Sequence, residues 1–447
     1  MKYAYFLIAI LLAVDNVFIR FRVGGLSIDR LLEFGLFFLF LKSFLLELKT
    51  NPYFKTYTTF LVGFALLQLL VNFKMAIFGD MEFKEVYVDF VKCFSFLVFS
   101  FLFLLIAKKD PKYINIILFI HFLICVFAFL QHPISPIASQ MFEVKKLLFS
   151  SLPGEEMGRL GTEEAYIEGG FGDRFRLSGP FAYSIGFSYF ALSSFILGFY
   201  MYLRHRRSYY LWYLGLLFVA SLLSQTRSLL LAELFLVFGY LFFAPGRKHA
   251  LYKMSLVAGA LTLLLLVYAA EDVLSFGNSR ITQLNSERQS DSRPLLWATG
   301  LYAVAQHPLG ISDSDYMAVR KEMFLKNGQS AVLLLSAHNG LINIGFHYSA
   351  IGYVVFFFFV LFLLRHIGSH KPTFAVFFRL VLLSYLIHTS FHNNFILNAD
   401  YPFLMILMLI GLAGTSQSML REDLSITDPN GARAPRVALC QNTTKNR

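Results

Sequence analysis

The sequence predicts an all-α polytopic membrane protein with about twelve transmembrane helices. Of its 447 residues, 57% are hydrophobic and only 15% are charged, whereas about a quarter of the residues of a soluble protein are charged. A soluble domain could not bury this much apolar surface, and a disordered chain would be far less hydrophobic. The apolar runs are continuous, as in Val354 to Leu364, whereas the strands of a membrane β-barrel alternate apolar and polar residues.

Polar stretches divide the apolar runs into groups. We expect N-terminal spans at 1–131, a first long loop at 132–180, central spans at 181–270, a second long loop at 271–337, C-terminal spans at 338–414 and a disordered polar tail at 415–447. The first run resembles a signal peptide, but Asp15 and Asn16 stand where cleavage needs small residues, so we predict an uncleaved span. In the second loop, residues 294–306 predict an amphipathic helix. The predicted spans are 3–19, 28–47, 54–73, 84–107, 113–131, 181–203, 209–225, 228–244, 251–270, 338–364, 373–390 and 396–414.

Lysine and arginine set the predicted orientation, because cytoplasmic loops of membrane proteins are enriched in both. The net charge of +11 is explained largely in this way, so no nucleic-acid partner is expected. With both termini in the cytoplasm, both long loops lie outside. The thirteen basic residues of the inside loops are Lys49, Lys55, Lys108, Lys109, Lys112, Arg204, Arg206, Arg207, Arg247, Lys248, Lys253, Arg365 and Lys371. The six in short outside loops are Arg20, Arg22, Arg30, Lys74, Lys84 and Arg227.

Several arginines fall on the outer face, where this rule disfavours them. They are Arg176, Arg227, Arg280, Arg288 and Arg293. Guanidinium groups bind phosphate bidentately and stay charged at any working pH, so a cluster of them predicts a site for a lipid-linked diphosphate. For Arg227, in a tight turn between two spans, the alternative is an arginine that reaches lipid headgroups. Arg280 and Arg288 lie in a polar segment, where their charges can simply be solvated.

Histidines on the same face are candidate proton acceptors. His338 opens the tenth span together with Asn339, and a neutral imidazole can take a proton from an attacking hydroxyl. The alternative for His338 is a helix cap. His307 is followed by a Pro-Leu-Gly turn that explains the region structurally, although a substrate contact stays open. His388 and His392 are further residues that could line the site.

Charged residues within the spans do not discriminate between classes of protein. Asp15, Glu33, Asp89, Lys92 and Glu233 lie in or near apolar runs, where such residues usually face the bundle interior and pair with one another. Asp89 and Lys92 are three residues apart, which favours a local ion pair. The sequence has no P-loop, Rossmann fingerprint or His-Glu-x-x-His motif, so we expect no nucleotide cofactor and no nucleotide sugar, and an already activated substrate instead.

Short motifs in residues 170–365 resemble the O-antigen ligase and Wzy-type polymerase superfamily of bacterial envelopes. In chain order they are Arg-Leu-Ser-Gly-Pro-Phe at 176–181, Ser-Gln-Thr-Arg-Ser at 224–228, Ser-Arg-Pro-Leu-Leu-Trp at 292–297, His-Pro-Leu-Gly at 307–310 and His-Asn-Gly-Leu at 338–341, followed by Gly345 and Gly352. Ser228 departs from the pattern, because many relatives have glycine there.

This resemblance implies a GT-C-like, metal-independent, inverting glycosyltransferase of the bacterial inner membrane whose active site faces the periplasm. The donor would be a glycan on undecaprenyl diphosphate. Arg227 and Arg293 would hold the diphosphate, His338 would activate the acceptor hydroxyl, and Arg176 would add an anion contact. Arg280, Arg288, Asn339 and His307 are the further candidates for contact with the substrate.

Several activities remain open. A polymerase would use a lipid-linked repeat unit as acceptor, with membrane lipids and a chain-length regulator as further partners, and the two large outer loops favour it slightly. An O-antigen ligase would use the lipid A-core instead. A transporter or flippase for lipid-linked sugars would explain the spans, but it would normally show an internal repeat, and the sequence has none. A purely structural membrane subunit predicts no cluster of outer-face arginines.

Overall fold

The computed structural model describes residues 2–14, 22–23, 26–79, 81–132, 135–149, 177–181, 184–245, 259, 293–329, 331–334, 336–392 and 400–423. Nearly all of them are helical, apart from two short antiparallel strands, β1 (Arg22–Val23) and β2 (Leu26–Ser27). The helices are α1 (Lys2–Ala13), α2 (Ile28–Leu39), α3 (Leu41–Thr50), α4 (Pro52–Phe78), α5 (Phe83–Lys109), α6 (Lys112–Leu130), α7 (Ala138–Phe149), α9 (Ser184–His205), α10 (Tyr209–Leu223), α11 (Arg227–Phe243), α14 (Arg293–Gln306), α15 (Asp313–Asn327), α16 (Ala331–Leu334), α17 (Gly340–Gly368), α18 (Pro372–Thr389) and α19 (Tyr401–Asp423).

Six of these helices are long and apolar enough to cross a membrane: α4, α5, α6, α9, α17 and α18. Shorter apolar helices add to them at Lys2–Ala13, Tyr209–Leu223 and Tyr401–Ala413. The predicted class of helical, membrane-embedded protein is therefore confirmed, whereas the count of twelve spans stays a prediction. The predicted helix at 294–306 is present as α14.

The structure differs from the predicted spans at several places. The predicted span 28–47 is broken at Phe40, whose backbone N–H is shared between the carbonyls of Leu36 and Phe37, both at 3.1 Å. This tightened last turn separates α2 from α3, so each is too short to cross a membrane alone. α19 continues to Asp423 instead of ending near 414. The predicted span 251–270 lies outside the described residues except for Gly259.

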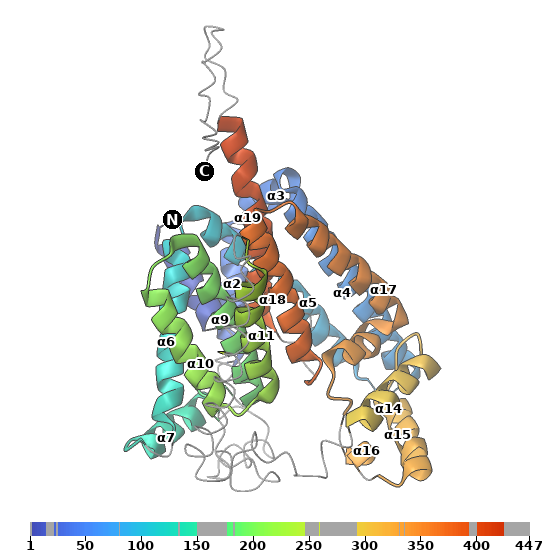
Figure 1. Ribbon diagram of the computed structural model, residues 1–447. Helices are drawn as coiled ribbons and strands as arrows, with labels where there is room; N and C mark the ends of the chain where they lie inside the picture. The colour runs from blue at the N-terminus through green and yellow to red at the C-terminus, as the bar shows by residue number, and fades with distance from the viewer. Residues whose placement is uncertain are drawn as a thin grey trace, which may run out of the picture.

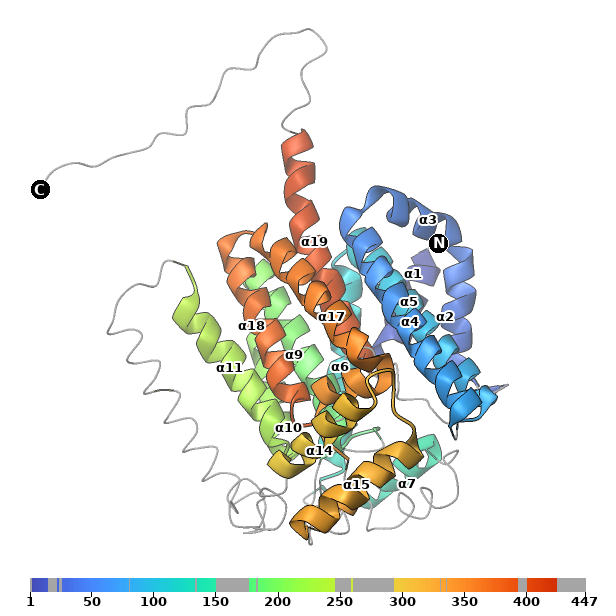
Figure 2. The same ribbon diagram turned by 90° about the vertical axis from the view of Figure 1, so that its right-hand side faces the viewer.

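The helices form an elongated bundle with two distinct ends (Figures 1 and 2). We call the end that carries α7, α14, α15 and α16 the lower end, as drawn in Figure 1; α3 and the last turns of α19 lie at the upper end. A Lys108–Glu47 ion pair of 2.7 Å joins α5 to α3 at the upper end. The connections between α3 and α4 and between α5 and α6, both predicted inside loops, lie at this end, whereas the turn between α10 and α11, a predicted outside loop, lies at the lower end (Figure 1).

The interior of the bundle is aromatic and closely packed around α9. Of the most apolar stretch of α9, 89% is buried, against 22% for α17. Close approach of helices depends on glycines: a Cβ at Gly198 would lie 2.8 Å from the Tyr213 ring of α10. Large apolar side chains such as Leu70 and Phe357 remain exposed on the outer surfaces of α4 and α17, as expected for helices that face lipid.

α17 is two helices joined by a kink at Ser349. Ser349 has φ 65° and ψ 178°, a backbone conformation that is otherwise almost confined to glycine. The kink frees the backbone N–H of Ala350, which donates to the Pro308 carbonyl at 2.8 Å. The Ser349 hydroxyl accepts from the N–H of Ile351 at 3.3 Å. Pro308, in the His-Pro-Leu-Gly turn, thereby holds the bend, and the first half of α17 packs beside α14 at the lower end (Figure 2).

Candidate functional site

Arg227 is the first residue of α11 and is exposed at the lower end. A three-residue turn separates α10 from α11, and its middle residue, Gln225, has a left-handed φ of 51°. The Ser224 hydroxyl donates to the Ser221 carbonyl at 2.8 Å and closes the end of α10. The turn is thus tightly built from short polar side chains, and it presents Arg227 at the N-terminus of a helix, where the helix dipole adds positive potential.

Arg293 lies near Arg227 although the two are far apart in the sequence. It opens α14, is partly buried, and has its guanidinium carbon 5.4 Å from the centre of the Phe391 ring. Trp297, one turn later, packs on the same ring with centroids 6.0 Å apart. Burial lowers the pKa of the Arg293 guanidinium, and the charge of Arg227 lowers it further. Both guanidinium groups nevertheless stay protonated at neutral pH, so the two helix N-termini carry two neighbouring positive charges.

No carboxylate among the described residues forms an ion pair with Arg293. This distinguishes Arg293 from a structural arginine such as Arg30, which lies 2.7 Å from Glu33 and stacks on the Tyr401 ring. A partly buried guanidinium beside a second one is an unfavourable arrangement unless an anion joins them. The arrangement therefore suits the binding of a doubly charged anion such as a diphosphate.

A buried cluster of hydrogen-bonded side chains includes the residue that follows Arg227. The Ser228 hydroxyl is 3.1 Å from His388 Nδ1 and 2.7 Å from His392 Nε2. His388 Nε2 lies 3.2 Å from the Ser188 hydroxyl of α9. The two histidines, expected as possible lining of the site, are thus tied to the residue that follows Arg227. The contact of Phe391 with Arg293 was not anticipated from the sequence, because one more aromatic residue does not stand out in a chain with 52 phenylalanines.

His338 precedes α17 and lies beside α14. Its φ of 45° is left-handed, which is uncommon for a residue other than glycine. The preceding Ala337 packs against Gly300 of α14, where an added Cβ would lie only 2.9 Å from the Ala337 Cβ. Gly300 is seven residues after Arg293, or about 10 Å along the helix. His338 is therefore held at the lower end, next to a segment that packs against α14, the helix that Arg293 opens.

Asn339 has a structural role in the described structure. It is the N-cap of α17, and its side-chain oxygen accepts from the N–H groups of Leu341 at 2.9 Å and Ile342 at 3.3 Å. The capping role that was the alternative for His338 thus falls to its neighbour. Substrate contact by Asn339 stays a prediction.

His307 lies away from the arginine pair. It follows the last residue of α14, roughly 20 Å along the helix from Arg293, and its Nδ1 is 3.6 Å from Asp315 Oδ2. Hydrogen bonding by Ser312 lowers the pKa of Asp315 and keeps this carboxylate ionised. With Pro308 at the α17 kink, these contacts support the structural interpretation of the His-Pro-Leu-Gly turn.

The segment after Arg176 docks on the same end of the bundle. The Leu177 N–H donates to the Leu223 carbonyl of α10 at 3.0 Å, and the buried Lys145 ammonium donates to the Ser178 hydroxyl at 2.6 Å. Gly179 takes a left-handed φ of 56°. Arg176, Arg280 and Arg288 themselves lie outside the described residues, so their predicted contacts with an anion stay predictions.

Charged residues within the helices have local partners. Asp89 Oδ2 accepts from Gln68 and Asn72, each at 3.0 Å, and Ser221 donates to Glu233 at 2.8 Å. Among the described residues, no group of three or more His, Cys, Asp and Glu side chains could hold a metal ion.

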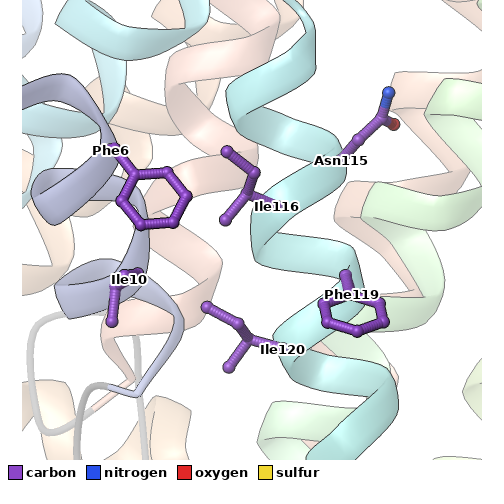
Figure 3. Close-up of a pocket in the computed structure, with 6 residues that line it drawn as sticks. All are labelled: Phe6, Ile10, Asn115, Ile116, Phe119 and Ile120. Atoms are coloured by element: carbon purple, nitrogen blue, oxygen red, sulfur yellow. The ribbon is translucent and has the colours of Figure 1, made fainter. Parts of the chain in front are cut away.

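An apolar groove of about 430 Å³ lies between α1 and α6 (Figure 3). Its lining is Phe6, Ile10, Asn115, Ile116, Phe119 and Ile120. The one polar member, Asn115, accepts a hydrogen bond from Tyr210. No charged side chain lines this groove.

Neither a family model, nor a curated protein, nor a solved structure matches the chain.

Proposed function

We propose that this membrane protein transfers a glycan from a lipid-linked diphosphate to an acceptor hydroxyl at its lower end. The single observation that carries the proposal is the pairing of Arg227 and Arg293 at two helix N-termini. Two adjacent guanidinium groups are complementary to a diphosphate, which offers several oxygens to bidentate donors. A site at one end of a membrane bundle also suits a substrate whose lipid tail stays in the bilayer.

The reaction needs groups that bind the diphosphate and a base that accepts a proton. The acceptor oxygen forms a bond to the anomeric carbon while the bond from that carbon to the diphosphate oxygen breaks, with inversion. His338 accepts the hydroxyl proton. Arg227 and Arg293 stabilise the negative charge that grows on the departing diphosphate, which is the usual way in which fixed charges lower a barrier. The diphosphate ester supplies the driving force, so this mechanism needs no nucleotide.

The proposal includes membership of the O-antigen ligase and Wzy-type polymerase superfamily, with a GT-C-like fold. The protein would lie in the bacterial inner membrane with both termini cytoplasmic and the lower end in the periplasm. The clustering of Lys and Arg at the opposite end supports this orientation. We favour a polymerase that extends a lipid-linked repeat unit, with a ligase acting on lipid A-core as the alternative, because the chemistry is the same and only the acceptor differs.

The test is to replace Arg227, Arg293 and His338 singly by Ala in full-length protein and to complement cells that lack the gene. We expect each variant to reach the membrane and to lose at least 90% of the envelope glycan, since each removes roughly 2 kcal/mol or more of charged hydrogen bonding or base catalysis. Arg365→Ala is the matched control, because Arg365 is an exposed arginine at the upper end. Near-normal glycan in all three variants would overturn the proposal.

Deletion of the gene separates the two acceptors. A single repeat unit still attached to the lipid A-core indicates a polymerase. Loss of attached glycan with accumulation of lipid-linked polymer indicates a ligase. Envelope glycans resolved on a gel distinguish these patterns directly.

A further inference from the structure

A single hydroxyl joins the first turn of α11 to the last turn of α18. Ser228 Oγ is within 3.1 Å of His388 Nδ1 and within 2.7 Å of His392 Nε2. All three side chains are buried, with exposed fractions of 7%, 0% and 8%. Serine near a helix start commonly bonds to its own backbone; here the hydroxyl instead reaches across to another helix.

This bridge connects the two arginines through their neighbours in the chain. Ser228 directly follows Arg227, and His392 directly follows Phe391. The Phe391 ring lies under the Arg293 guanidinium. A continuous path therefore links the two guanidinium groups. It consists of covalent bonds along the chain, the Ser228–His392 hydrogen bond and one ring contact.

The arginine pair needs such a tie. Like charges repel each other, and after burial the charge of Arg227 is the second cause that lowers the pKa of Arg293. Arg227 is exposed, and the position of its guanidinium depends on where the backbone at the start of α11 is fixed. A diphosphate bound by both groups requires that the helix starts stay at one spacing.

We propose that Ser228 is the positioning residue of the arginine pair, and that its bridge to His388 and His392 holds Arg227 and Arg293 at the spacing that grips a diphosphate. The inference rests on the proposed function for the identity of the anion. In this role Ser228 does not contact the substrate and acts through the two arginines. It also gives a role to the serine at a position where glycine was expected from the resemblance.

The first experiment measures binding of inorganic pyrophosphate to the full-length chain in lipid nanodiscs. We expect Ser228→Ala to raise Kd about tenfold, which corresponds to the loss of one buried hydrogen bond. Ser228→Thr keeps the hydroxyl and should restore a Kd close to that of the wild type. Ser194→Ala is the matched control, because it removes another buried serine–histidine contact, the 2.8 Å contact with His121 Nδ1, at a place with no path to the arginines.

The second experiment measures the spacing without any ligand. Spin labels at Leu231 on α11 and Leu301 on α14, which are 51% and 54% exposed, report the distance between the two helices in a chain whose three cysteines are replaced. We expect a narrow distance distribution that broadens in Ser228→Ala and narrows again in Ser228→Thr.

The outcomes separate this inference from the proposed function. Pyrophosphate binding that needs Arg227 and Arg293 but is unchanged in Ser228→Ala overturns the positioning role and leaves the proposed function standing. An equal loss in Ser194→Ala, or an unchanged distance distribution in Ser228→Ala, also overturns it. If the wild type does not bind pyrophosphate, the proposed binding of a diphosphate by the arginine pair is wrong, and the positioning role of Ser228 is refuted as well.

Discussion

Substitution of Gly300 by Ala tests whether α14 sets the position of His338. A Cβ at Gly300 would lie 2.9 Å from the Ala337 Cβ and 2.9 Å from Ile342 Cγ2. Carbon atoms in contact are normally about 3.5–4.0 Å apart, so α14 and the segment before α17 must separate by roughly 1 Å. Because Ala337 directly precedes His338, a shift of Ala337 also displaces the backbone of His338.

The substitution should harm activity far more than stability. Overpacking costs about 1–3 kcal/mol, and the higher helix propensity of Ala returns about 1 kcal/mol of this. The net loss is therefore roughly 0–2 kcal/mol, which leaves most of the protein folded. A displacement of about 1 Å at a catalytic base, by contrast, can lower the rate about 100-fold.

The assay is glycan production in complemented cells, normalised to the amount of protein in the membrane. Gly215→Ala is the matched control, because it makes the same change in α10, where an added Cβ meets nothing within 4 Å. We expect wild-type glycan from Gly215→Ala and at least a tenfold loss from Gly300→Ala. Wild-type glycan from Gly300→Ala at normal membrane levels would refute the reasoning.

Four further substitutions, at three positions, test the geometry of the lower end and of the kink. Arg293→Lys keeps the charge but loses the planar fork, so pyrophosphate binding should weaken about tenfold, as measured by titration of the protein in nanodiscs. Ser349→Gly should raise the free energy of unfolding by up to about 1 kcal/mol, because relief of the strained backbone exceeds loss of the 3.3 Å hydrogen bond to the Ile351 N–H. Ser349→Ala keeps the backbone strain and should lower the free energy of unfolding by a similar amount. Gly179→Ala should destabilise by about 1–2 kcal/mol, because φ is 56° there and the new Cβ would lie 3.2 Å from the Ala128 Cβ; unchanged thermal unfolding would contradict it.

Composition and charge were sufficient to predict the membrane-embedded helical class, because both depend on sums over many residues. The nearness of Arg227 and Arg293 could also be anticipated, since the positive-inside rule left both on the disfavoured face. The aromatic partner of Arg293 could not be anticipated. Phe391 is one of many phenylalanines, and only the fold brings its ring under Arg293.

Breaks in helices were missed for a related reason. No proline stands near Ser349 in the sequence, and the partner that satisfies the freed Ala350 N–H is Pro308, some forty residues earlier. Phe40 likewise carries no breaking signal, although its N–H is shared between two carbonyls. Tertiary contacts decide such positions, and propensity is too weak to reveal them.

Replacement of Arg293 by Gln separates a functional arginine from a structural one. Because burial and the charge of Arg227 both lower the pKa of Arg293, the folded protein disfavours the charged form, so the charge opposes folding at every pH at which it is present. Gln removes the charge and, among the described residues, loses the ring contact at 5.4 Å. We therefore expect a transition temperature equal to or above that of the wild type, together with loss of pyrophosphate binding. A clearly lower transition temperature would mean that Arg293 is needed for the fold, and that loss of glycan in Arg293→Ala reports misfolding.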